Sequence, residues 1–236
     1  QMQTGAQNSF VGYRSANDLT SATSNVAIGF RALTGLTTAT TCTAVGNDAL
    51  RFMQDGTVAT GTGVSRVGLG SNTRVSGDNQ VQIGDSSSTT YVYGTVQNRS
   101  DARDKADVRD TILGLDFINA LRPVDYKLDM RDDYFEEYEH DTGLVDDLGK
   151  PIIETRLRKL EKDGSRKRNR FHHGLVAQEV KAVCDSLGVD FGGYQDHLIN
   201  GGCDVQTLGY DELIAPLIKA VQQLSAEISA LKAANV

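Results

Sequence analysis

One short stretch of the chain combines residue types that could cut a peptide bond: Arg99-Ser100-Asp101-Ala102-Arg103-Asp104-Lys105. A serine hydroxyl is a poor nucleophile until a base takes its proton, and a neutral lysine can be that base. The pKa of such a lysine, ordinarily about 10.4, must be lowered by burial or by a nearby cation. A separation of five residues fits neither one face of a helix nor one side of a strand. Ser100 and Lys105 would therefore have to meet across a turn or between chains, and their spacing alone does not establish chemistry.

Other kinds of chemistry have less support. The first half of the chain contains no Glu and only scattered Asp, which argues against the paired carboxylates of a glycosidase. The cysteines Cys42, Cys184 and Cys203 are odd in number and lack the spacing of a zinc site. We therefore expect no disulfide framework, no metal and no cofactor. The net charge of -7 gives no general case for nucleic acid or an anionic membrane as partner.

Two basic clusters leave nucleic-acid binding open as an alternative, at residues 156–159 and 166–170. They flank a turn signal, Asp163-Gly164, so we interpret them as a solvated arm that grips acidic loops of neighbouring chains. A salt-sensitive shift with duplex DNA would favour the alternative. We expect no membrane insertion, because no apolar run approaches ~18 residues, and no secretory leader. Since the chain starts with Gln1-Met2, we expect it to be part of a longer polypeptide.

The composition changes near residue 100. Before Lys105 there is no Lys or Glu, and Gly, Ser, Thr and Asn dominate. From Asp101 onward the chain is rich in charge and contains amphipathic stretches. We place the boundary at Asn98-Arg99-Ser100 and expect two domains, residues 1–99 and 100–236.

Internal repeats organise the first domain. An apolar residue followed by Gly recurs as Val11-Gly12, Ile28-Gly29, Val45-Gly46, Leu69-Gly70 and Ile83-Gly84, and the first three are 17 residues apart. Each unit predicts a short strand, such as 25–28, and a Gly that permits a tight turn. A disordered Gly/Ser/Thr linker is the alternative, but linkers do not keep period and phase.

The apolar content of each repeat is too small for one chain to bury a core. Stacked repeats help, but three chains around an axis close such a core better. The pattern resembles the head repeats of trimeric autotransporter adhesins and of phage fibre tips, most clearly over 8–50 and more loosely over 64–85. Residues 85–97 look like a final β segment. For a fibre tip we expect receptor binding through loops such as 34–43 and 52–62.

The second domain alternates helical and strand patterns. We predict helices over 108–121 and 176–187, a strand over 124–128, a long acidic loop over 129–150, and a hairpin in which 152–160 pairs with 166–176. The C-terminal stretch carries an a/d seam: Ile214, Leu217, Val221, Leu224, Ile228 and Leu231. This seam predicts a coiled coil, and a helix packed on its own domain is the alternative. β-Branched residues at a with Leu at d favour two strands in isolated coils, so the seam alone does not choose three chains.

Four motifs in this order resemble the intramolecular chaperone domain of the S74 peptidase family, which ends phage endosialidases, tail fibres and neck appendages. They are the Ser-Asp-x-Arg-x-Lys pattern at 100–105, Leu121-Arg122-Pro123-Val124-Asp125-Tyr126, Phe171-His172-His173-Gly174 with Ala177-Gln178-Glu179, and Tyr210-Asp211-Glu212-Leu213. The resemblance covers residues 100–236.

The resemblance implies a homotrimeric folding aid that cuts itself off before the serine of the first motif. Carried over, Ser100 is the nucleophile, Lys105 is the general base, and the scissile bond joins Arg99 to Ser100. Asp101 and Arg103 also match the pattern, and His172 matches a family histidine whose role stays open.

We therefore expect an all-β trimeric repeat, β-helix-like or β-stem-like, followed by an α+β chaperone domain with a C-terminal helix or coiled coil. The expected protein is the end of a phage tail fibre or tailspike, assembled in the bacterial cytoplasm and carried on the virion. It would bind a host-surface receptor, sugar or protein. The alternative is a structural fibre tip or adhesin whose trimerisation domain stays attached without cutting.

Overall fold

The computed structural model describes residues 4–145 and 149–235, which form two compact units. The first unit holds the described residues up to Tyr91 together with those of 128–169 and 197–205. The second holds 92–127, 170–196 and the described residues from Gln206 on. Segments beyond residue 100 thus contribute to both units. The predicted division into domains 1–99 and 100–236 stays a prediction. None of the helices in these ranges is long and apolar enough to cross a membrane.

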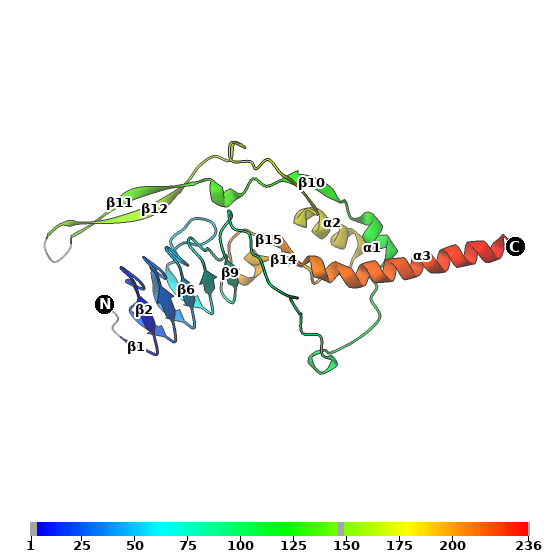
Figure 1. Ribbon diagram of the computed structural model, residues 1–236, viewed down its shortest axis with the longest axis horizontal. Helices are drawn as coiled ribbons and strands as arrows, with labels where there is room; N and C mark the ends of the chain where they lie inside the picture. The colour runs from blue at the N-terminus through cyan, green and yellow to red at the C-terminus, as the bar shows by residue number, and fades with distance from the viewer. Residues whose placement is uncertain (1–3, 146–148, 236) are drawn as a thin grey trace. The chain divides into compact units, whose positions relative to one another are not determined.

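The predicted repeats form two parallel sheets in the first unit (Figure 1). One sheet contains β1 (Thr4–Ala6), β3 (Ser21–Thr23), β5 (Leu36–Thr40) and β7 (Gly61–Val64). The other contains β2 (Ser9–Val11), β4 (Val26–Ile28), β6 (Thr43–Val45), β8 (Val67–Leu69) and β9 (Val81–Ile83). The apolar residues of the repeat share one register across the second sheet, in the column Val11, Ile28, Val45, Leu69 and Ile83. The strands predicted from the repeat are confirmed, and the linker alternative is wrong for these residues; closure by three chains stays a prediction.

The Gly residues after the first three residues of this column, Gly12, Gly29 and Gly46, are required by both conformation and space. Gly29 has a φ of 135°, and a Cβ added there would lie 2.3 Å from the carbonyl oxygen of Gly46. Gly12 stands in the same relation to Gly29, at 2.5 Å. A larger residue at either position would push neighbouring rungs of the stack apart.

Small side chains fill the interior of the stack, together with one buried amide. The buried apolar residues include Ala22, Ala27, Ala39, Ala44, Leu33, Leu36 and Leu50. The Asn25 side chain donates to Asn8 Oδ1 and to the Ala39 carbonyl, each at 2.9 Å, and accepts from the Cys42 N–H at 2.9 Å. This amide joins three successive rungs through hydrogen bonds that small apolar side chains cannot supply.

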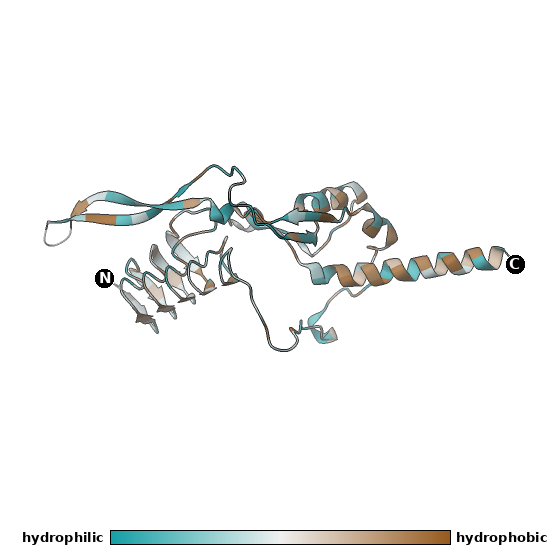
Figure 2. Ribbon diagram, turned by 45° about the horizontal axis from the view of Figure 1, so that its top comes forward, coloured by the Kyte–Doolittle hydropathy of each residue, from teal (hydrophilic) through white to brown (hydrophobic). Residues whose placement is uncertain are grey.

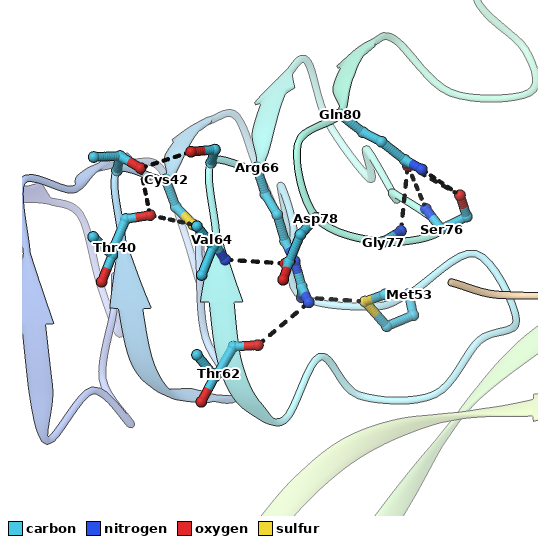
Figure 3. Close-up of polar contacts among 12 residues, drawn as sticks. Thr40, Cys42, Met53, Thr62, Val64, Arg66, Ser76, Gly77, Asp78 and Gln80 are labelled. Carbon is cyan, nitrogen blue, oxygen red and sulfur yellow. Dashed lines mark hydrogen bonds and ion pairs between the residues drawn. The ribbon is translucent and has the colours of Figure 1, made fainter. Parts of the chain in front are cut away.

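Charged residues complete the later rungs (Figure 3). Arg66 Nε donates to Asp78 Oδ1 at 2.6 Å, and the same oxygen accepts from the Val64 N–H at 3.0 Å. The Arg66 Nη2 atom also donates to the Thr62 carbonyl at 3.3 Å. These contacts tie the loop before β9 to the edge of β7.

The predicted final β segment over 85–97 is not a strand in the single chain. Its apolar side chains Tyr91, Val92, Tyr93 and Val96 are all exposed. A strand needs hydrogen-bond partners for its backbone, and the segment has no regular pairing with the rest of residues 4–145 and 149–235. The segment predicted as a receptor loop at 34–43 is also different, because β5 occupies residues 36–40 of it.

A long hairpin in the first unit replaces the predicted acidic loop. β11 (Phe135–Val145) pairs antiparallel with β12 (Pro151–Lys159), so the predicted pairing of 152–160 with 166–176 is wrong. One cross-strand ion pair favours this partner, because Glu136 lies opposite Arg158. The Asp163-Gly164 signal marks a bend in the connection that follows β12. A 3-10 turn, η2 (Arg131–Asp133), precedes β11, and η3 (His197–Asn200) also belongs to this unit.

The second unit is built from helices and two-stranded antiparallel sheets. β10 (Val124–Lys127) pairs with β13 (Phe171–Gly174), and β14 (Tyr194–Asp196) pairs with β15 (Gln206–Leu208), both antiparallel. The predicted strand over 124–128 and the helix over 176–187, which is α2 (Ala177–Leu187), are confirmed. The core contains Phe117, Val180, Cys184 and Phe191.

The first helix of this unit, α1 (Leu115–Ala120), is shorter than the predicted helix over 108–121. Asp107 has a φ of 50°, which a right-handed helix excludes. The Thr111 hydroxyl accepts the Leu113 N–H at 3.1 Å, a local bond that competes with helical hydrogen bonding. The apolar spacing before Leu115 therefore does not translate into helix.

The C-terminal helix α3 (Ile214–Ala234) follows the 3-10 turn η4 (Tyr210–Leu213) and confirms the predicted helix. It packs against α1 through a face that includes the buried Pro216 and Ala220, and Gln223 Oε1 accepts the Leu115 N–H at 2.7 Å. The a/d seam lies outside this contact, with exposed fractions from 43% at Leu224 to 63% at Leu231. Figure 2 shows the hydrophobic residues along α3.

Candidate active site

Ser100 and Lys105 meet across one turn of 3-10 helix, η1 (Ala102–Asp104). Asp101 caps the turn by accepting the Arg103 N–H at 2.9 Å. The Lys105 N–H donates to the Ala102 carbonyl at 3.2 Å and so closes the turn. The chain reverses enough that Lys105 Nζ donates to Ser100 Oγ at 2.8 Å. Of the two arrangements that the spacing leaves open, the structure has the turn.

The Arg103 side chain holds this cap in place. Its Nε and Nη2 atoms donate to the two carboxylate oxygens of Asp101, at 3.0 and 2.6 Å. These hydrogen bonds from Arg103 hold the pKa of Asp101 below its usual value, and the same contact raises the pKa of Arg103. Asp101 therefore remains an ionised acceptor for the turn at ordinary pH. Both supporting residues of the motif thus act on the turn rather than on the serine.

Asp104, the neighbour of the candidate base, binds another cation. Its Oδ2 atom lies 2.9 Å from Arg99 Nη2. An unpaired carboxylate next to Lys105 would favour the charged form of that lysine. The ion pair gives Asp104 a partner other than Lys105, and it also contacts the side chain on the other side of the candidate scissile bond.

The direction of the Ser100–Lys105 hydrogen bond and the exposure of both residues define what the site still needs. A charged lysine can only donate a hydrogen bond in this contact. Catalysis requires the reverse, with a neutral amine accepting the hydroxyl proton. Both residues are exposed in the single chain, and burial is what favours a neutral lysine. A covering surface is therefore the missing element.

His172 lies on β13, opposite Tyr126 on β10, and the two rings stack with centroids 5.9 Å apart. Within the described residues no hydrogen bond joins His172 to Ser100 or Lys105. Its neighbour His173 contacts Asp125, with Nδ1 and Oδ1 2.5 Å apart. The structure therefore brings Ser100 and Lys105 together but gives His172 a stacking contact within the sheet.

The remaining motifs contact one another in the second unit. Arg122 Nε donates to Glu179 Oε2 at 2.9 Å. The Tyr210 hydroxyl accepts the Leu175 N–H at 2.9 Å, and a Cβ added to Gly174 would lie 2.5 Å from that hydroxyl. Arg122, Glu179 and Tyr210 belong to the motifs, but the motifs alone predict no role for them. Their place in the motifs was the available signal.

The segment before the candidate cut is also held. Asn98 Nδ2 donates to Asp211 Oδ2 at 2.6 Å, which ties this segment to the Tyr210-Asp211-Glu212-Leu213 motif. These two residues are far apart in sequence, so no local pattern could reveal their contact.

Comparisons with family models, with curated proteins and with solved structures found no match to this chain. The family resemblance therefore rests on the motifs themselves. Over the part of the chain that the structure describes, no group of three or more His, Cys, Asp and Glu residues is placed to hold a metal ion.

Proposed function

We propose that this chain is the C-terminal part of a phage tail fibre or tailspike and that residues 100–236 drive its trimerisation and folding. The assembled trimer then cuts each chain between Arg99 and Ser100. The observation that carries this proposal is the contact of 2.8 Å between Lys105 Nζ and Ser100 Oγ, directly beside the bond to be cut.

In the proposed reaction, Ser100 Oγ attacks the carbonyl carbon of Arg99 while Lys105 Nζ takes the hydroxyl proton. The new C–O bond replaces the C–N bond of the peptide, and the proton passes from Nζ to the departing amine of Ser100. Water then hydrolyses the ester, which releases the Arg99 carboxylate and restores the Ser100 hydroxyl. The neighbouring chains supply the cover that favours a neutral Lys105, so cutting waits for assembly.

Two apolar surfaces of the single chain support assembly. The α3 seam is exposed along its length, and the column of the second sheet is exposed at both ends, by 61% at Val11 and 53% at Ile83. Burial of apolar area contributes about 25 cal/mol per Å². Contact with other copies would thus stabilise both surfaces, and it would also thicken the thin interior of the stack.

The order of events follows from folding physics. Parallel sheets form slowly because distant residues must pair first. A helical module that trimerises early holds three β segments at high effective concentration. Once the module is removed, an unfolded fibre can no longer be brought back into register, so the mature fibre is stable for kinetic reasons.

The test is denaturing electrophoresis of purified wild type beside Ser100→Ala. The proposal predicts two pieces in the wild type, with Ser100 at the start of the C-terminal piece, and one intact chain in the variant. An intact trimeric wild type would favour a structural fibre tip with an attached trimerisation domain. Two pieces in Ser100→Ala would overturn the assignment of the nucleophile.

A further inference from the structure

A charged cluster on the β stack follows the phase of the repeat. Asp48 stands 17 residues after Arg31, and its carboxylate binds two arginines. Arg31 Nη2 lies 2.8 Å from Asp48 Oδ2, and Arg51 Nη1 lies 3.1 Å from Asp48 Oδ1. The three side chains are only 14%, 2% and 7% exposed for Arg31, Asp48 and Arg51. Two guanidinium groups that share one carboxylate leave a net positive charge in this enclosed cluster.

The hairpin covers the cluster with neutral atoms. Thr155 of β12 accepts hydrogen bonds from both arginines: Oγ1 from Arg31 Nη1 at 2.9 Å, and the carbonyl oxygen from Arg51 Nη2 at 2.5 Å. The Arg31 Nε atom is buried and has no hydrogen-bond partner among the residues that the structure describes. Burial and the neighbouring Arg31 lower the pKa of Arg51. The hairpin thus satisfies some donors of the cluster with neutral atoms, while the charge of Glu137 on β11 also acts on Arg51.

A cavity of about 260 Å³ adjoins the cluster, between the stack and the hairpin. Its lining includes Arg14, one repeat before Arg31. Two carboxylates, Asp18 and Glu154, also line it, and Glu154 pairs with Arg156 at 3.3 Å. Beside Arg14 the Tyr13 ring is largely exposed and stacks on Phe30, with centroids 5.7 Å apart. The cavity therefore presents arginine donors, and the Tyr13 ring lies beside Arg14, with its centroid 5.6 Å from the Arg14 guanidinium carbon.

We infer that this arginine cluster is an anion-binding site of the fibre tip, and that Thr155 covers it until the chaperone part leaves. The ligand presents carboxylate or phosphate oxygens, as acidic surface polymers do, where the Thr155 oxygens now lie. Arginine suits such groups because its planar fork donates two hydrogen bonds to one anion. The Tyr13 ring offers a face for the less polar part of the ligand. This inference rests on the proposed function, because release of residues 100–236 removes Thr155.

The test uses three probes: oligogalacturonate as the carboxylate, polyphosphate as the phosphate, and neutral dextran. Their binding is measured by calorimetry on the separated product of the cut wild type and on the uncut Ser100→Ala chain. We expect the cut product to bind one of the two anions at least about tenfold more tightly than dextran, with affinity that falls as salt rises. The uncut chain should bind neither anion better than dextran.

A variant that needs no cutting separates this inference from the proposed function. In the Ser100→Ala chain, Thr155→Arg places a third cation against Arg31 and Arg51 and should expose the cluster; Thr155→Lys serves if the first variant does not fold. Glu161→Gln changes the charge of the same segment equally and should leave the site covered. Adding Arg31→Gln should weaken anion binding by about tenfold, whereas Arg109→Gln should not.

If the uncovered variant binds an anion but the wild type is never cut, the proposed function is wrong and the anion-binding site stands. If neither the cut product nor the uncovered variant prefers an anion to dextran, the cluster serves only to dock the hairpin and the inference is overturned.

Discussion

The Nζ atom of Lys105 lies 2.8 Å from the Oγ atom of Ser100, across a turn that Asp101 caps and Lys105 itself closes. Both ends of this contact depend on local hydrogen bonds, so the pair is preorganised before any second chain arrives. Assembly then has to cover the turn rather than build it. Lys105, the turn, the β stack and the α3 seam can therefore be tested separately.

Lys105 should be required for cutting as a base and not as a positive charge. Lys105→Ala and Lys105→Arg should each slow cutting by at least about 100-fold, because a guanidinium cannot accept the Ser100 proton. The cut fraction is followed over time on denaturing gels. Lys181→Ala, which removes an exposed lysine paired with Asp185, should cut at the wild-type rate. Wild-type cutting by Lys105→Arg would rule out general-base catalysis by this residue.

The Asp101–Arg103 contact should give the turn a defined pH dependence. Arg103 lowers the pKa of Asp101 in the folded chain. The stabilisation is therefore fully present above the unfolded carboxyl pKa of about 3.9 and is lost as the pH falls through the lower folded value. NMR titration of the Asp101 carboxyl in the Ser100→Ala chain should give a midpoint below about 3.9. Arg103→Ala should move that midpoint up, and an unchanged midpoint would refute the contact.

Gly29→Ala should destabilise the stack by about 1–3 kcal/mol or more, since it adds strain at positive φ and a clash with Gly46. Gly61→Ala is the matched control, because Gly61 has a φ of 75° but no atom within 4 Å of an added Cβ. Urea unfolding of both variants should show a clearly larger loss for Gly29→Ala. Equal losses would mean that close approach of the rungs is unimportant.

Leu224→Asp should break the coil without unfolding the second unit, because Leu224 belongs to the exposed seam rather than to the α1 contact. The variant should sediment as a monomer, keep its helical circular dichroism signal and fail to cut. Gln222→Asp, on the same helix but outside the seam, should remain trimeric and active. A trimeric Leu224→Asp chain would remove the seam from the assembly interface.

Periodic features of this fold could be predicted from sequence, and contacts between distant segments could not. The 17-residue spacing and the Gly after each apolar residue determine strands, register and turns, because each rung repeats the same local conformation. The predicted hairpin is wrong because Asp163-Gly164 is a strong local turn signal. The observed pairing, in which Glu136 lies opposite Arg158, depends on charges across two strands. The helix start was misplaced because Thr111 and Asp107 favour a local turn that apolar spacing does not reveal.

The candidate site shows the same limit. The Ser-Asp-x-Arg-x-Lys pattern contains the nucleophile, the base and both capping residues, so the whole turn could be expected from one motif. The contact of Asn98 with Asp211 and the position of His172 depend on tertiary packing. The Arg31–Asp48–Arg51 cluster has a signal in the sequence, because Arg14, Arg31 and Asp48 occupy the same position of the 17-residue repeat.

Native mass spectrometry of freshly purified wild type beside Leu224→Asp tests the central claim most directly. The account predicts a wild-type trimer in which the chains are cut immediately before Ser100, and a monomeric variant whose chain remains whole. A wild-type monomer with an intact bond between Arg99 and Ser100 would contradict it.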